Sequence, residues 1–189
     1  MYFILVAYPV LGAGLKYIDD AFDEKIFSKK LALALAPLLG VLWAYTMLVD
    51  QFSATILLAI LIGVFLRGKI DNYAHFTGLI IIAGITIYVG INLLILPLVL
   101  LAAAAFLDEM GNDIIDYNLD NLDETYVWHK LFIRFFDQRW LTKVAIVYVI
   151  LLGVFPPYFF VALLLFDGAY LAVRLYSRSQ HQIQRAVCA

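Results

Sequence analysis

The sequence predicts an all-α protein, a bundle of helices embedded in a membrane. Of its 189 residues, 65% are hydrophobic and only 15% are charged, whereas ordinary soluble domains are about 45–50% apolar and about 25% charged. The hydrophobic residues form long runs interrupted by short polar or Gly- and Pro-containing segments, as in polytopic membrane proteins. We therefore expect one transmembrane domain over residues 1–189, in contact with the lipid bilayer and without a nucleic-acid partner. The sequence leaves the oligomeric state open.

Seven apolar runs predict seven transmembrane helices, several of them shorter than the usual length of about 20 residues. The first run lacks the basic n-region and the small-residue cleavage site of a secretory signal, so it is expected to be the first span. The number of predicted helices depends on breaks at Gly90–Asn92 and Phe155–Pro157, because without each break the two flanking apolar runs would form one helix. The predicted spans are residues 2–18, 31–48, 52–66, 75–89, 92–107, 142–155 and 158–177.

The distribution of charge predicts the orientation of the chain. With seven spans, all 13 Lys and Arg residues fall on one side of the membrane, whereas fusing either doubtful pair of helices would place them on both sides. Basic loops mark the cytoplasmic side, so the N-terminus is expected outside and the C-terminus inside. Of the 15 acidic residues, only Asp50 lies in an outer turn. Any polar chemistry is therefore expected at the cytoplasmic face.

The longest segment between predicted spans is residues 108–142, which we expect to be cytoplasmic or interfacial. Its second half, residues 126–140, interleaves aromatic with basic residues. Such a pattern is typical of a helix that lies in the membrane interface.

An acidic stripe follows the fifth predicted span. Glu109, Asp113, Asp116, Asp120 and Asp123 recur at spacings of three and four, which places them within an arc of roughly 80° on a helix. Like charges stacked in this way repel one another, so a cation is expected beside them. Carboxylates are the oxygen ligands that Mg²⁺ prefers. The stripe therefore predicts a Mg²⁺ site at Asp113, Asp116 and Asp120, although a solvated acidic face would show the same pattern.

A second acidic cluster, Asp19, Asp20 and Asp23, follows the first predicted span and reads D-D-x-x-D. Asp19 and Asp23 are one helical turn apart and would face a common ligand, with Asp20 at the edge of that arc. A simple polar exit from the membrane would look similar. Two opposed acidic clusters could clamp a diphosphate through bridging metal ions and stabilise its charge as it departs.

Basic side chains on the same predicted face could neutralise a leaving diphosphate. Arg67 and Lys69 precede the fourth predicted helix, where Asp71 or Asn72 would also make a good N-cap. The candidates for binding the diphosphate are Lys69, Arg134, Arg139 and Arg174, with Lys130 in addition.

Asp167 lies inside the last predicted span, where burial of an ionised side chain costs several kcal/mol unless it is paired or hydrated. It is expected either to pair structurally or to line the polar cavity. Arg174 follows about two turns later, on the same face but too far away for contact. Tyr170, like most aromatic residues in the spans, fits the role of an interface anchor, although aromatic faces can also stabilise a carbocation.

Residues 112–120 fit the pattern N-D-x-x-D-x-x-x-D, which resembles the first aspartate-rich motif of the UbiA superfamily of intramembrane prenyltransferases. The resemblance implies an all-helical bundle with a polar cavity on the cytoplasmic side. There, aspartates would bind Mg²⁺ and the diphosphate of a polyprenyl donor, which ionises to an allylic cation and alkylates an acceptor. By motif position the metal-diphosphate residues would be Asn112, Asp113, Asp116 and Asp120. The D-D-x-x-D cluster resembles that of isoprenoid diphosphate enzymes in general.

Two other functional classes stay open on the sequence alone. A cation transporter or channel with an acidic cytoplasmic vestibule would need polar residues through the whole membrane thickness. The outer halves of the predicted helices offer little beyond Thr46, Ser53, Thr55, Thr86 and Asn92. A non-catalytic membrane scaffold, whose acidic loop binds a basic partner, is the second alternative.

Overall fold

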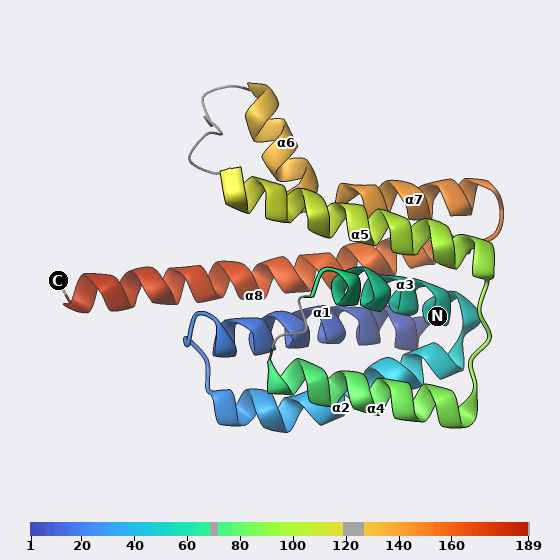
Figure 1. Cartoon of the computed structure of the whole chain (residues 1–189), viewed down its shortest axis with the longest axis horizontal. Helices are drawn as coiled ribbons and strands as arrows, with labels where there is room; N and C mark the ends of the chain where they lie inside the picture. The colour runs from blue at the N-terminus through green and yellow to red at the C-terminus, as the bar shows by residue number, and fades with distance from the viewer. Residues whose placement is uncertain (69–71, 119–126, 189) are drawn as a thin grey trace. The chain divides into compact units, whose positions relative to one another are not determined.

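The computed structural model describes residues 1–68, 72–118 and 127–188, apart from the side chains of residues 116, 118 and 183–188 (Figure 1). Within these ranges the chain forms eight helices and no strand, which confirms the predicted all-α class. The helices are α1 (Tyr2–Phe22), α2 (Lys29–Val49), α3 (Gln51–Leu66), α4 (Tyr73–Val89), α5 (Ile95–Asn118), α6 (Val127–Asp137), α7 (Trp140–Leu151) and α8 (Tyr158–Cys188).

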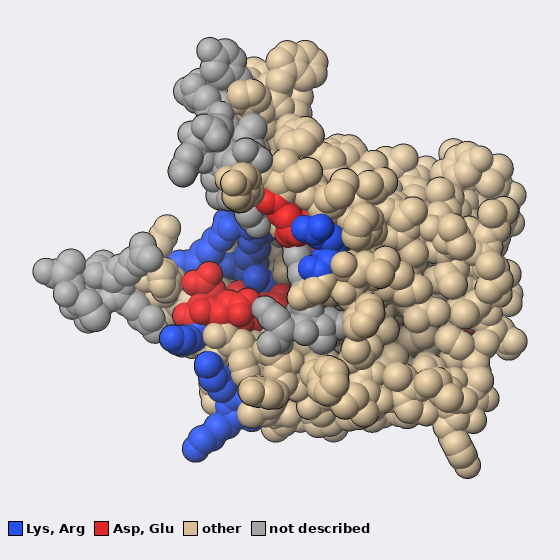
Figure 2. Space-filling view, viewed as in Figure 1, with Lys and Arg blue, Asp and Glu red and all other residues tan. Residues whose placement is uncertain are grey.

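Three of these helices are long and apolar enough to cross a membrane: α2 over Lys29–Val49, α5 over Ile95–Ile115 and α8 over Tyr158–Gln182. The apolar helices α3, α4 and α7 are shorter. Ile87, Leu96 and Leu151 expose 82%, 82% and 79% of their surface, and most of the surface drawn in Figure 2 carries neither Lys, Arg, Asp nor Glu. Exposed apolar surface on this scale is unfavourable in water and suits a lipid environment.

The helices are interrupted at both predicted breaks. Helix α4 ends at Val89, before Gly90, and helix α8 begins at Tyr158, directly after Pro156 and Pro157. Asn72 is the N-cap of α4, since its side chain accepts a hydrogen bond from the backbone N–H of His75 at 2.9 Å. This outcome selects Asn72 from the two predicted caps.

Several helices extend beyond the predicted spans. Helix α5 begins at Ile95 but continues to Asn118, and α8 continues to Cys188. Hydropathy predicts that these helices end where the hydrophobic residues stop. The polar residues that follow contain no Pro, so the backbone hydrogen bonds of each helix continue through them. In the opposite direction, α7 ends at Leu151 rather than near residue 155, because Gly153 turns the chain in a left-handed conformation with φ of 72°.

The chain divides into two compact units, each assembled from separate stretches of sequence. The first contains α1, α2, α4 and α8 from Val161 onward, and the second contains α3, α5, α6, α7 and the first residues of α8. Two compact units within one chain are compatible with one transmembrane domain over residues 1–189, which stays a prediction.

The core of the first unit lies where α1, α2 and α8 meet. Tyr8 of α1 and Phe166 of α8 are almost fully buried, and their rings meet edge to face with centroids 6.4 Å apart. Trp43 of α2 packs on the same Phe166 ring at 6.2 Å. Aromatic pairs in this geometry add stability beyond the area that they bury.

In the second unit, α3 packs along α5. The closest approach is at Gly63, where an added Cβ would lie 2.8 Å from the Cβ of Ala105. Small residues at helix crossings allow this close packing, which is common between membrane helices. The contact holds the last turn of α3 against the apolar part of α5 just before Asp108, where the polar end of α5 and the candidate site begin.

Candidate functional site

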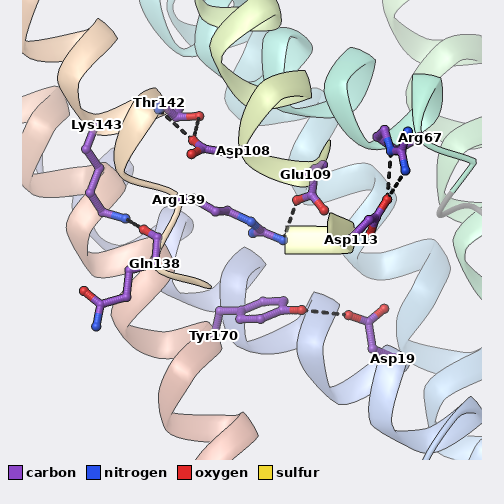
Figure 3. Close-up of polar contacts among 10 residues, drawn as sticks. All are labelled: Asp19, Arg67, Asp108, Glu109, Asp113, Gln138, Arg139, Thr142, Lys143 and Tyr170. Atoms are coloured by element: carbon purple, nitrogen blue, oxygen red, sulfur yellow. Dashed lines mark hydrogen bonds and ion pairs between the residues drawn. The ribbon is translucent and has the colours of Figure 1, made fainter. Parts of the chain in front are cut away.

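The carboxylate of Asp108 on α5 holds the beginning of α7 in the second unit (Figure 3). It accepts hydrogen bonds from the backbone N–H groups of Leu141 and Thr142 at 3.0 and 2.7 Å, and from the Thr142 hydroxyl at 2.7 Å. These N–H groups belong to the first turn of α7, which has no helical acceptor for them and attracts negative charge. Asp108 is fully buried. Its hydrogen bonds to the first turn of α7 make it a structural cap that a neighbouring helix supplies.

Glu109, the next residue, forms an ion pair with Arg139. Its Oε1 lies 2.8 Å from a guanidinium nitrogen, and the Glu109 side chain is only 4% exposed. Arg139 immediately precedes α7 and has a left-handed backbone with φ of 51°. The cation expected beside Glu109 in the acidic stripe is therefore the Arg139 side chain. Arg139 was predicted to bind diphosphate, but in the structure it neutralises this buried carboxylate.

Asp113 lies one turn further along α5 and contacts Arg67 at the end of α3. The Arg67 Nε donates to Oδ2 of Asp113 at 2.8 Å, and a terminal guanidinium nitrogen contacts the same oxygen. The two side chains are 31% and 30% exposed, so this pair remains accessible, unlike the two carboxylates before it. Asn112 beside it is half-buried.

Three predicted site residues cannot be placed with the rest. The side chain of Asp116 and the whole of Asp120 and Lys69 lie outside the described residues. Their proposed roles stay predictions, as does the acidic stripe beyond Asp113.

In the first unit, Asp19 near the end of α1 bridges two other helices. Its Oδ1 lies 2.6 Å from Nε2 of His75 on α4, and its Oδ2 accepts a hydrogen bond from the hydroxyl of Tyr170 on α8 at 3.2 Å (Figure 3 shows the Tyr170 contact). His75 and Tyr170 are 56 and 151 residues away from Asp19 in the chain. No local pattern could have identified them as partners of this carboxylate.

Asp20 is paired within its own helix. Lys16 contacts Oδ1 of Asp20 at 2.9 Å and also lies over the Tyr170 ring, 5.3 Å from its centroid. Asp20 is only 3% exposed, and within the described part of the chain its Oδ2 has no hydrogen-bond partner. A buried acceptor without a partner is costly, so Asp20 is the least satisfied carboxylate of this cluster.

The remaining predicted site residues are more dispersed. Asp23 is exposed and directly follows α1 with helical backbone angles, and its N–H donates to the Asp19 carbonyl at 2.9 Å, so the predicted one-turn spacing is present. Asp167 and Arg174 are half-buried on α8, and Arg134 is exposed on α6.

Among the described residues, no three His, Cys, Asp or Glu side chains come together as a metal site. Each unit instead has its own carboxylates at the end of one helix, α1 in the first unit and α5 in the second, and most of them are paired with a base or a hydrogen-bond donor of the same unit. Asp113 with Arg67 is the accessible pair that lies within the N-D-x-x-D-x-x-x-D motif.

No match to the chain was found among protein-family models, curated proteins or solved structures. The functional conclusion therefore depends on the motif and on the contacts described above.

Proposed function

We propose that the chain is an integral membrane enzyme of the prenyltransferase type, which binds an isoprenoid diphosphate with Mg²⁺ at the polar end of α5. The Asp113–Arg67 pair carries this proposal. It places an accessible carboxylate and an accessible guanidinium side by side within the motif that resembles that of the UbiA superfamily. Carboxylates bind Mg²⁺ and guanidinium groups bind phosphate oxygens, so the pair offers both kinds of group that a metal-bound diphosphate needs.

A small number of carboxylates is sufficient for such a site. Proteins usually hold Mg²⁺ by one or two carboxylates, and substrate phosphates and waters complete the octahedron. The proposed ligands at α5 are Asn112, Asp113, Asp116 and Asp120. Bound Mg²⁺ would offset the charge that develops on the diphosphate as the carbon–oxygen bond of the donor breaks. The acceptor then bonds to the allylic carbon and releases a proton.

Arg67 is a better phosphate ligand in this proposal than Arg139. Arg139 neutralises Glu109, whose side chain is 4% exposed, and removing one partner of a buried ion pair typically costs about 3–5 kcal/mol. Arg67 pairs with a carboxylate that is 30% exposed, so exchange with a ligand costs far less. Lys69, Arg134 and Arg174 stay candidates for the leaving diphosphate, and Asp167 for the cavity wall.

The D-D-x-x-D cluster is proposed as the second set of metal-diphosphate ligands. Asp19 would have to exchange its contacts with His75 and Tyr170. Asp20 offers its buried Oδ2, which a cation could take without displacing a protein partner among the described residues. Asp23 is exposed beside them.

The proposed site requires the predicted topology, with seven spans (α1–α5, α7 and α8), an outer N-terminus and a cytoplasmic active face. Three helices, α2, α5 and α8, are long and apolar enough to span a membrane, and the one-sided distribution of Lys and Arg that seven spans would give supports the orientation. In a Cys188→Ser background, a cysteine introduced at the exposed position Gln51 should react with an impermeant maleimide from outside the cell. Labelling only after the membrane is opened would overturn this orientation.

The polar residues in the outer halves of the helices favour one-sided chemistry over a transmembrane ion path. The hydroxyls of Thr46, Thr55 and Thr86 donate to carbonyls of their own helices at 2.7, 2.8 and 2.7 Å. Hydroxyls that serve their own backbone do not line a hydrated path across the membrane.

Thermal unfolding of the purified protein in detergent tests the proposal. Mg²⁺ together with geranylgeranyl diphosphate should raise the Tm of the wild-type protein, whereas either alone should not. The diphosphate supplies oxygen ligands to Mg²⁺, and Mg²⁺ links the diphosphate to the carboxylates. At a ligand concentration 100 times Kd, the stabilisation is about 2.7 kcal/mol. Asp113→Asn should lose the shift, and Glu24→Gln, the same change at an exposed carboxylate, should keep it.

The ligand-free Tm of each variant separates loss of binding from loss of folding. Absence of a Mg²⁺-dependent shift in wild-type protein with any isoprenoid diphosphate would exclude the proposed function. Ion flux into liposomes that depends on Asp113 would indicate a cation pathway instead.

A further inference from the structure

Helix α6 presents an apolar face that the described part of the chain leaves exposed. Val127, Trp128 and Leu131 are 67%, 80% and 52% exposed, and no residue of α6 is buried. At 100° per residue, these three side chains fall within an arc of about 100°. A contiguous apolar face of this kind indicates a binding surface for lipid or for another protein.

Basic side chains flank this face. Lys130 and Arg134 are exposed and lie one turn apart, within an arc of about 40° at the side of the apolar face. Asp137, at the end of the helix, is the acidic residue of α6 and lies on the same flank. Long basic side chains beside an apolar face typically extend to lipid phosphates while their alkyl stems remain in the apolar layer.

The direction of α6 also fits a membrane surface. Within the second unit, α6 contacts α5 and α7 and is steeply inclined to α5 near the polar end of that helix (Figure 1). If α5 crosses the bilayer, α6 therefore lies along the bilayer surface rather than through it. With 11 residues, α6 is also too short to span the hydrocarbon layer.

Helix α6 is held against α5 at Gly111. An added Cβ at this position would lie 2.0 Å from a ring carbon of Phe136, so the ring occupies the space that any larger residue would need. The rings of Phe132 and Phe135 pack edge to face on Phe136, with centroid distances of 4.9 and 5.3 Å. Because Gly111 directly precedes Asn112 of the candidate site, this contact places α6 next to that site.

We propose that α6 is a membrane-surface anchor that binds a leaflet rich in anionic phospholipids. Val127, Trp128 and Leu131 insert at the level of the upper acyl chains, and Lys130 and Arg134 contact lipid phosphates. Anionic headgroups match the two exposed basic residues, whereas a neutral leaflet would use the apolar face alone. This inference goes beyond the proposed function, because it requires no isoprenoid diphosphate and assigns Arg134 to lipid phosphates rather than to the leaving diphosphate.

Fluorescence of Trp128 in proteoliposomes tests the proposal. Trp43→Phe and Trp140→Phe leave Trp128 as the remaining tryptophan. Trp43→Phe keeps an aromatic ring at this buried position and removes an indole N–H that has no partner among the described residues. The vesicles contain phosphatidylcholine, alone or mixed with phosphatidylglycerol, and carry bromine atoms on the upper acyl chain. Bromine should quench Trp128 in the mixed vesicles more strongly than in the neutral ones, and acrylamide should quench it weakly.

The double variant Lys130→Gln/Arg134→Gln should lose the difference between mixed and neutral vesicles. The matched variant Lys29→Gln/Lys30→Gln, which removes two exposed lysines at the start of α2, should retain it.

Strong acrylamide quenching without bromine quenching would overturn the proposal, because Trp128 would lie in water. Protection from both quenchers would also overturn it, since another protein surface would then cover α6. An unchanged lipid preference in the α6 double variant would contradict the role of its basic residues.

Discussion

Neighbouring carboxylates on α5 have different environments, and their environments decide what each can do. Asp108 caps α7, Glu109 is a buried partner of Arg139, and Asp113 shares an accessible contact with Arg67. The spacing of acidic residues predicts a stripe that includes Glu109 and Asp113 but not Asp108. It could not distinguish the roles of these residues, because each role depends on a partner outside α5.

The residue scale yields a prediction about stability at Asp108. Asp108→Ala removes the fully buried acceptor of two backbone N–H groups and of the Thr142 hydroxyl, and the two hydrogen bonds from Thr142 are themselves buried. Leaving buried donors without a partner costs about 1–3 kcal/mol each at most sites, so the variant should unfold at markedly lower SDS content in mixed micelles. Asp108→Asn retains one acceptor oxygen and should lose less.

Glu24→Gln serves as the control for this measurement, since Glu24 is exposed. Equal stability of Asp108→Ala and wild type would show that Asp108 does not hold α7, and the assignment of a structural role would be wrong.

Asp19 shows how far sequence alone can identify a site. The D-D-x-x-D pattern points to Asp19, which lies in a polar cluster with the one-turn spacing to Asp23, and its role as a metal ligand stays a prediction. Its partners His75 and Tyr170 lie on α4 and α8. The sequence predicts Tyr170 as an interface anchor and assigns no role to His75, the first residue of the fourth predicted span. Only the tertiary contacts show that both share the Asp19 carboxylate.

At the scale of elements, hydrophobicity predicted where apolar helices exist but not where they end. All seven apolar runs are helices, and the breaks at Gly90 and at Pro156–Pro157 are real. Helix α5, however, extends to Asn118, so the first part of the proposed metal motif lies on the same continuous helix as an apolar segment. Residues 126–140 were predicted as an interfacial helix, and α6 covers Val127–Asp137, with α7 beginning at Trp140.

The contact between α5 and α6 gives a prediction at this scale. Gly111→Ala places a methyl group 2.0 Å from a carbon of the Phe136 ring, and overpacking of this kind typically costs about 1–3 kcal/mol. We therefore expect reduced resistance to SDS and increased acrylamide quenching of Trp128 as α6 loosens.

Gly168→Ala on α8 is the matched control, because nothing lies within 4 Å of a Cβ added there. In a helix this change removes flexibility from the unfolded chain and should be neutral or stabilising by up to about 1 kcal/mol. If both variants behave alike, Phe136 does not hold α6 on α5.

At the scale of the whole molecule, the sequence predicted a helical membrane protein but not how its helices are grouped. Helix α3 packs with α5, although α4 lies between them in the chain, and α8 joins α1 at the opposite end of the sequence. Hydropathy contains no information on such pairings, because every apolar helix presents similar surfaces to lipid and to its neighbours. Contacts such as Gly63 against Ala105 and Tyr8 against Phe166 specify them instead.

The central claim is that the polar end of α5 binds an isoprenoid diphosphate together with Mg²⁺. Equilibrium binding of radiolabelled geranylgeranyl diphosphate to the purified protein, with Mg²⁺ or with EDTA, measures this directly. We expect Mg²⁺-dependent binding, a loss of affinity of at least about tenfold in Asp113→Asn, and a smaller loss in Arg67→Gln. Binding that is absent, or that is indifferent to both Mg²⁺ and Asp113, would contradict the claim.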